Sequence, residues 1–132
     1  MAQNDEVKLL KFSLLVAAIV SLVYGLGYLL APAIVANLSG GNPVEFGWLR
    51  WAGGVIIALG IGALMVYSKP EKQGIFVLSI ALAHLLAGLG MLYSWIMHEY
   101  SGATWFIALP TCLTLVLSAL LFWGRSKAKG IL

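Results

Sequence analysis

The sequence predicts an all-α membrane protein, a bundle of four transmembrane helices with its N and C termini on the cytoplasmic side. Three observations lead to this fold class. Hydrophobic residues make up 61% of the 132 residues and charged residues only 10%, so lipid must form part of the solvent. Four apolar stretches of about twenty residues are long enough to cross a hydrocarbon core of about 30 Å. Nearly all Lys and Arg residues fall on one side of the resulting topology.

The four predicted helices cover about 12–31, 47–68, 74–97 and 103–124, and residues 1–132 are predicted to form a single integral membrane domain. Each stretch is continuously apolar, without the alternation of barrel strands. Only helices or closed barrels satisfy backbone polar groups in lipid, so these stretches are predicted to be helices. The breaks between them read SGGNPVE, SKPEKQG and HEYSGA, and their Gly, Pro and charged residues favour turns.

The orientation follows from the basic residues. Seven of the eight lie before the first stretch, between the second and third, or after the fourth: Lys8, Lys11, Lys69, Lys72, Arg125, Lys127 and Lys129. Arg50 is predicted on the other side. The positive-inside rule therefore places both termini in the cytoplasm. Because the basic residues are few, dispersed and next to the membrane, we expect the lipid bilayer and not nucleic acid as the partner of this charge.

Small residues predict how the first two helices pack. On the second helix, one face carries Arg50 followed at intervals of four by Gly54, Ala58 and Gly62. The first helix carries a similar stripe of Ala17, Ser21 and Gly25. Small residues let helix backbones approach closely in lipid, so we expect these two stripes to face each other. Arg50 would then lie at the outer end of the contact.

Two interpretations of Arg50 remain open. In the structural one, Arg50 fixes the topology and forms a salt bridge with Glu45 or Glu99, or contacts backbone carbonyls. In the functional one, it binds an anionic ligand or a lipid headgroup at the outer face. His98 is predicted at the same end of the bundle and completes this set of candidate residues.

His84 lies about ten residues into the third stretch, near the predicted middle of the bilayer, where ionisable residues are rare and often functional. It shares a helix face with Gly88, Met91 and His98. A rise of 1.5 Å per residue separates His84 from His98 by about 21 Å, and metal bonds to His are near 2 Å. The two histidines cannot share an ion within one helix, so no metal site is predicted.

His84 itself has two interpretations. As an axial ligand it would hold a tetrapyrrole, with Gly88 one turn away leaving room for the ring. Alternatively, it is a neutral core residue that forms a hydrogen bond with a hydroxyl group of a neighbouring helix. Residues at similar depth that could supply this hydroxyl are Ser21, Thr111 and Thr114.

The segment YLLAPAIVANLSGG, followed by FGWLRWAGGVIIALGIGAL, resembles the small four-helix DoxX-like bacterial membrane proteins. The matching region covers residues 24–64 and includes Arg50, Gly53, Gly54 and Gly60. The resemblance implies a four-helix bundle with both termini inside, in the plasma membrane of a bacterium, and an association with membrane redox systems. It carries no catalytic residue onto this chain.

Three classes of function remain. The favoured one is a non-catalytic accessory subunit that packs against other membrane proteins or against itself, since no catalytic constellation is recognised. The second is a DoxX-like redox module that binds quinone or a tetrapyrrole near His84. The third is a small oligomeric transporter or channel, which would use a helix kink at Pro110. The sequence assigns no particular cofactor.

Overall fold

The structure is a computed structural model that describes the backbone of residues 2–41 and 45–132, and the side chains within these ranges from residue 7 onward. In these ranges the chain forms five helices: α1 (Ala2–Leu30), α2 (Pro32–Ser39), α3 (Phe46–Ser68), α4 (Gly74–Ile96) and α5 (Thr104–Lys127). Most of α1, from Val7 on, and the whole of α3, α4 and α5 have the length and composition to cross a membrane. The predicted four-transmembrane-helix bundle is confirmed.

Two features of the helices differ from the prediction. α1 begins at Ala2, ten residues before the predicted start, because its polar leader contains no Gly or Pro to stop a helix from continuing past the apolar stretch. The short helix α2 was not predicted. It has Pro32 at its first position and is followed by Gly40, whose φ of 63° is left-handed. Proline at the start and glycine past the end are ordinary helix boundary signals.

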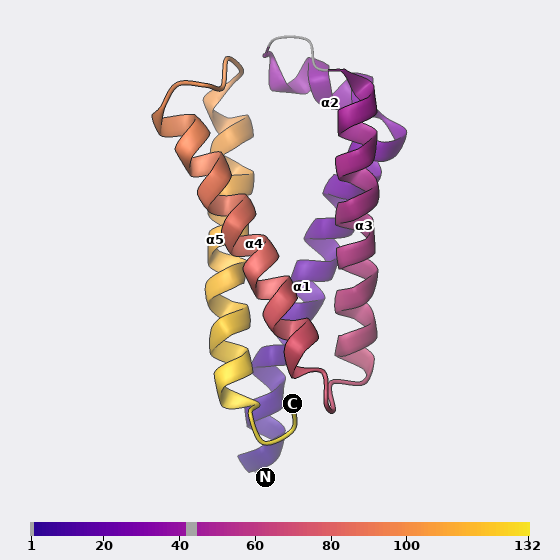
Figure 1. Ribbon diagram of the computed structural model, residues 1–132, viewed down its shortest axis with the longest axis vertical. Coiled ribbons are helices and arrows are strands. Elements are labelled where there is room, and N and C mark those ends of the chain that lie inside the picture. The colour runs from indigo at the N-terminus through magenta and orange to yellow at the C-terminus, as the bar shows by residue number, and fades with distance from the viewer. Residues whose placement is uncertain (1, 42–44) are drawn as a thin grey trace.

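The four long helices form two pairs. α1 packs along α3, and α4 packs along α5, so we refer to the α1–α3 arm and the α4–α5 arm. The arms meet at the end that carries both chain termini, the termini end, and diverge toward the opposite end, the far end (Figure 1). The main buried cluster accordingly lies toward the termini end and includes Leu10, Leu14, Val66, Val77, Ile80, Leu117 and Leu121.

Glycine allows α1 and α3 to approach backbone to backbone. A Cβ added at Gly53 would lie 2.7 Å from the carbonyl oxygen of Gly25, and also 2.7 Å from the backbone nitrogen of Leu29. Two turns along, a Cβ at Gly60 would lie 3.2 Å from the Cβ of Ser21. Neither position of α3 has room for a larger side chain. This is the close packing by small residues that stabilises helix pairs in lipid.

Of the small residues predicted for this contact, two on α1 lie against α3, whereas those predicted on α3 do not lie against α1. Ser21 and Gly25 do face α3, and Ala17 is fully buried. On α3, however, a Cβ added at Gly54 would meet no atom within 4 Å, and Ala58 is exposed. A spacing of four residues overshoots a helical turn by about 40°, so the predicted stripe winds away from α1. Gly62, at its end, packs against Phe76 of α4.

At the termini end, the two arms are joined by close contacts between α1 and α5. A Cβ at Gly124 would lie 2.8 Å from the Cα of Leu10. The α3–α4 connection is held here as well, because Arg125 Nε donates a hydrogen bond to the Gly74 carbonyl at 3.2 Å. The backbone nitrogen of Lys72 donates to the Ile131 carbonyl at 3.1 Å. The C-terminal segment therefore ties α5 to the start of α4.

At the far end, α2 joins the α4–α5 arm. The carbonyl of Ser39, the last residue of α2, accepts a hydrogen bond from the backbone nitrogen of Ala103 at 2.7 Å. The same carbonyl accepts a second bond from the Tyr100 hydroxyl at 3.2 Å. The arms are thus linked at both ends and separated between them.

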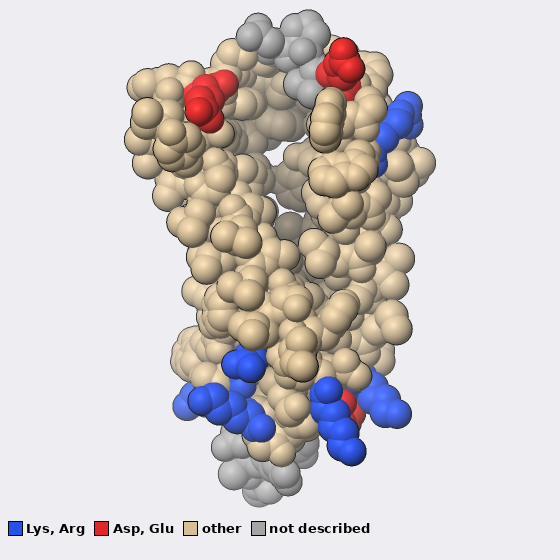
Figure 2. Space-filling model, viewed as in Figure 1, with Lys and Arg blue, Asp and Glu red and all other residues tan. Residues whose placement is uncertain are grey.

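Charge is distributed unevenly along the molecule. Figure 2 shows most of the Lys and Arg side chains at the termini end, with one acidic side chain among them. At the far end it shows acidic side chains on either side of the gap between the arms and one basic side chain. This pattern is the one from which the sequence predicts a cytoplasmic location for the termini. Which side of the membrane the termini face stays a prediction.

The adjacent glycines of α3 provide a test of the α1–α3 contact. We expect Gly53→Ala to lower the free energy of unfolding by about 1–3 kcal/mol, because the new methyl group would collide with the backbone of α1. Gly54→Ala should be neutral, or stabilising by up to about 1 kcal/mol, because alanine favours helix and the position is open. Unfolding by SDS in mixed micelles measures both. Equal effects at the two positions would contradict the packing.

Candidate functional site

The most prominent feature between the arms is an apolar cleft. Its deeper part is a cavity of about 410 Å³ lined by residues of α1, α3, α4 and α5, among them Val20, Ile56, Leu86 and Leu113. A second cavity, of about 330 Å³, continues toward the far end and shares four lining residues with the first: Tyr28, Gly90, Met91 and Pro110. We treat the two as one cleft. Figure 2 shows an opening between the arms on the face that carries α3 and α4.

His84 places an imidazole in the wall of this cleft. It lies near the middle of α4 and is 6% exposed. Its Nδ1 is 2.9 Å from the carbonyl oxygen of Ile80, one turn earlier. Because a carbonyl can only accept a hydrogen bond, Nδ1 must carry the proton of this bond. In a neutral ring the other nitrogen, Nε2, then has a free lone pair and can act only as an acceptor.

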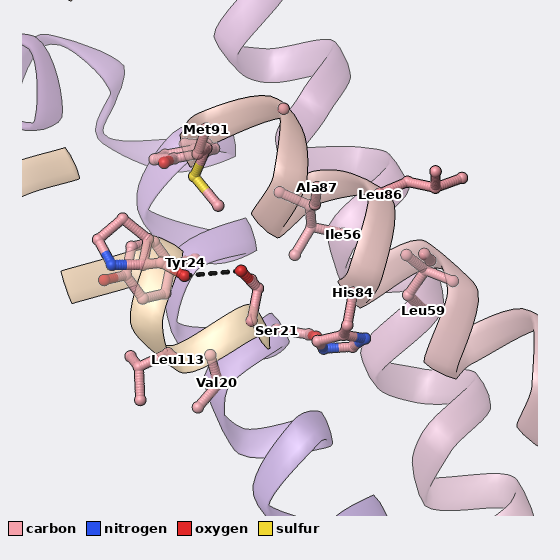
Figure 3. A pocket seen from close by; sticks show the side chains of 15 residues that line it. Val20, Ser21, Tyr24, Ile56, Leu59, His84, Leu86, Ala87, Met91 and Leu113 are labelled. Atoms are coloured by element: carbon pink, nitrogen blue, oxygen red, sulfur yellow. Dashed lines mark hydrogen bonds between the residues drawn. The ribbon is translucent and has the colours of Figure 1, made fainter. Parts of the chain in front are cut away.

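The second ring nitrogen of His84, Nε2, is left without a hydrogen-bond partner among the described residues. The His84 side chain forms one hydrogen bond with the described residues, and this bond goes to the Ile80 carbonyl. Within that same part of the chain, every fully enclosed polar side-chain atom has a hydrogen-bond partner, so Nε2 is not sealed inside the protein. His84 lines the cavity, and Figure 3 shows its ring among the other lining side chains. We infer that a ligand in the cavity can reach Nε2.

Ser21 contributes a second polar group from the opposite arm. Its side chain is 5% exposed and lines the same cavity, and Figure 3 shows it among the residues of α1 that face the cleft. The hydroxyl forms no hydrogen bond with the residues that the structure describes, in contrast to Ser13, which donates to the Leu9 carbonyl at 2.8 Å. The cleft therefore presents an acceptor on α4 and a hydroxyl on α1.

The predicted hydrogen bond between His84 and a neighbouring hydroxyl is wrong. Nδ1 bonds instead to the backbone of α4 itself, at the Ile80 carbonyl. The threonines are also occupied within their own helix: Thr111 donates to the Ile107 carbonyl at 2.7 Å and Thr114 to the Pro110 carbonyl at 2.8 Å. A hydroxyl that bonds its own helix cannot donate to His84 at the same time.

The expected room for a tetrapyrrole beside Gly88 is also not present. A Cβ at Gly88 would lie 2.6 Å from a side-chain carbon of Leu115, so α5 fills this space. Gly88 serves the contact between α4 and α5. The open side of α4 is instead the face of Ala87 and Met91, which line the cleft.

The four candidate residues of the outer face are not brought into one site. Arg50 donates a hydrogen bond to the carbonyl of Leu29 in the last turn of α1, where helix carbonyls lack partners within the helix. Contact with a backbone carbonyl is one of the partners expected for Arg50 if its role is structural. Glu99 lines the far-end cavity and accepts a hydrogen bond from Ser94 at 2.9 Å. Glu45 immediately precedes α3, and His98 is exposed with a left-handed φ of 56°.

Two tyrosines of the cleft were missed as site residues. Tyr24 and Tyr28 line the deeper cavity and form an edge-to-face pair with ring centroids 6.1 Å apart. Together with Ser21 they recur at offsets of three and seven along α1, which puts them on one helical face. Three polar side chains on one face of an otherwise apolar helix could have predicted that this face lines a site.

The chain was compared with models of protein families, with curated proteins and with solved structures, and it matches none of them. The class of protein is described by its architecture and its cleft: a multi-pass helical bundle with an apolar cleft between two helix pairs. The DoxX-like resemblance stays a prediction from the motifs in residues 24–64.

The hydrogen bond to Ile80 predicts the tautomer of His84. We expect ¹⁵N NMR of histidine-labelled protein to show a neutral ring with the proton on Nδ1, which is the less common tautomer of histidine in water. His98, which is exposed, serves as the reference signal in the same spectrum. A proton on Nε2 of His84 would contradict the geometry of the site.

Proposed function

We propose that this protein is a non-catalytic accessory subunit that packs against another integral membrane protein through α3. The observation that carries the proposal is the environment of Gly54. Within a helix, glycine is less favourable than alanine by about 0.5–1 kcal/mol. A Cβ added at Gly54 would meet no atom within 4 Å, so the packing of the chain itself does not require a glycine at this position.

Gly54 belongs to a larger face of small residues. A Cβ at Gly47 would likewise meet no atom within 4 Å, and Ala58 is exposed one turn beyond Gly54. We call these three residues the α3 outer face. Large apolar side chains exposed to lipid need no partner, but small residues allow a second helix to approach closely, and such residues are enriched at helix interfaces in membranes. The partner that suits this face is a transmembrane helix of another protein.

The sequence resemblance suggests the setting of this partner. Gly53, Gly54 and Arg50 lie in the segment that resembles DoxX-like proteins. The structure divides their roles, since Gly53 contacts α1 and Arg50 binds the end of α1, while Gly54 faces outward. We therefore propose a partner in a membrane redox complex of the bacterial plasma membrane.

The experiment is a comparison of two neighbouring variants, Gly54→Leu and Val55→Leu. Each is expressed in place of the native chain, and the membranes are extracted in mild detergent and separated on a native gel. We expect the native protein and Val55→Leu to migrate in a complex with other proteins, because position 55 already carries an exposed branched side chain. Gly54→Leu should release most of the chain to the mobility of the free subunit, since the bulk prevents close approach.

Two results would overturn the proposal. The first is a native protein that migrates alone or only as a homo-oligomer. The second is a Gly54→Leu variant that stays in the complex as completely as Val55→Leu does. Circular dichroism of the two purified variants controls for loss of helical structure.

A further inference from the structure

We propose that the cleft between the arms binds a neutral, lipid-soluble molecule that carries a hydroxyl group, and that this hydroxyl donates a hydrogen bond to Nε2 of His84. This site is separate from the α3 outer face, because none of Gly47, Gly54 and Ala58 lines either cavity. The inference therefore does not depend on the proposed role as an accessory subunit.

The size and lining of the cleft fit a small apolar ligand. The deeper cavity of about 410 Å³ lies within the range of about 300–1,000 Å³ found for small-molecule sites. Such sites are mostly apolar with a few polar groups that fix the orientation of the ligand. The polar side chains of this lining are Ser21, Tyr24, Tyr28, His84 and Thr114, and among them Ser21 and His84 lie on opposite arms.

The chemistry of these two groups selects a hydroxyl. Nε2 of His84 can only accept, because Nδ1 carries the proton that is donated to Ile80. The ligand must therefore offer a donor. Both side chains are more than nine-tenths buried, and the one hydrogen bond found for either of them among the described residues is that of His84 Nδ1. Because every fully enclosed polar side-chain atom in this part of the chain has a partner, Nε2 and the Ser21 hydroxyl are accessible to a ligand. A carbonyl or an ether could accept from Ser21 but would leave Nε2 unsatisfied, whereas a hydroxyl can donate to His84.

The charges near the cleft favour a neutral ligand. The residues that line the deeper cavity include no Asp, Glu, Lys or Arg. The far-end cavity adds one acidic residue, Glu99, whose carboxylate accepts a bond from Ser94. A carboxylate or phosphate group would find no Lys or Arg side chain in the lining of either cavity, and an ion without a partner is costly in such a site.

The cleft is accessible to a molecule dissolved in the bilayer. Its lining includes Leu86, which is 66% exposed, and Ala87, which is also exposed. Figure 3 shows these residues on the same helix as His84 and Met91. The apolar remainder of the ligand would lie along this side of α4, toward Met91 and the far-end cavity. Entry would require no passage through water.

The test uses two probes that differ only in the hydroxyl. The full chain, labelled with ¹⁵N-histidine in phospholipid nanodiscs, is titrated with para-nonylphenol and with para-nonylanisole, its methyl ether. The chain has two histidines, so exposed His98 is an internal reference. We expect the phenol to shift the Nε2 signal of His84 and leave that of His98 in place, and we expect the anisole to shift neither. No shift, or the same shift with both probes, would overturn the proposal.

Two variants test the two requirements for binding separately: the hydrogen bond to His84 and the space in the cleft. His84→Leu should weaken binding of radiolabelled nonylphenol about three- to tenfold, the effect of one hydrogen bond, and leave that of the anisole unchanged. Ala87→Phe should block the cleft and abolish the phenol-induced shift of His84, since Ala87 lines the cavity. The matched control is Leu89→Phe, which lies two residues away on α4, exposed and outside both cavities.

The two phenylalanine variants test the position of the ligand independently of His84→Leu. If His84→Leu does not fold, the comparison of Ala87→Phe with Leu89→Phe still decides the outcome. A phenol-induced shift that survives in Ala87→Phe, or one that is lost equally in Leu89→Phe, would show that the phenol does not bind in this cleft.

Discussion

The close approach of α1 and α3 is the contact on which the rest of the structure depends. Gly25 and Gly53 bring the two backbones together, and Gly60 continues the contact next to Ser21. In lipid there is little hydrophobic force to hold helices together, so close packing of this kind decides which helices pair. α3 packs along the length of α1 and makes few contacts with α4, which packs along α5 instead. Two arms result, and the space between them is the cleft.

The connections between the arms explain why the cleft lies where it does. At the termini end, Gly124 allows α5 to contact Leu10 of α1, and the buried core gathers there. At the far end, the Ser39 carbonyl links α2 to Ala103. Between these links the arms present polar groups that have no partner across the gap. Within the described residues every fully enclosed polar side-chain atom is hydrogen-bonded. The imidazole and the serine hydroxyl that line the same apolar cavity are instead available to a ligand, which makes the cavity a candidate site.

The sequence predicts the fold well and the site only in part. Length and hydropathy place all four long helices, because crossing a membrane constrains both properties. Small residues on α1 predict the contact with α3, but a spacing of four cannot determine whether Gly53 or Gly54 faces inward, since a shift of one residue rotates a helix face by about 100°. The position of His84 marks it as unusual. Its bond to Ile80 and the open Nε2 depend on the divergence of the arms, which no local pattern encodes.

The divergence of the arms is the central claim, and distances between spin labels test it most directly. In a Cys112→Ser background, one pair of labels at Met65 and Ile75 reports on α3 and α4 near the termini end, and a second pair at Val55 and Leu89 reports nearer the far end. All four positions are exposed, so labels should not disturb the packing. Double electron–electron resonance in nanodiscs should give a clearly longer distance for the second pair. Equal distances would mean that α3 and α4 run side by side, and the cleft would not exist.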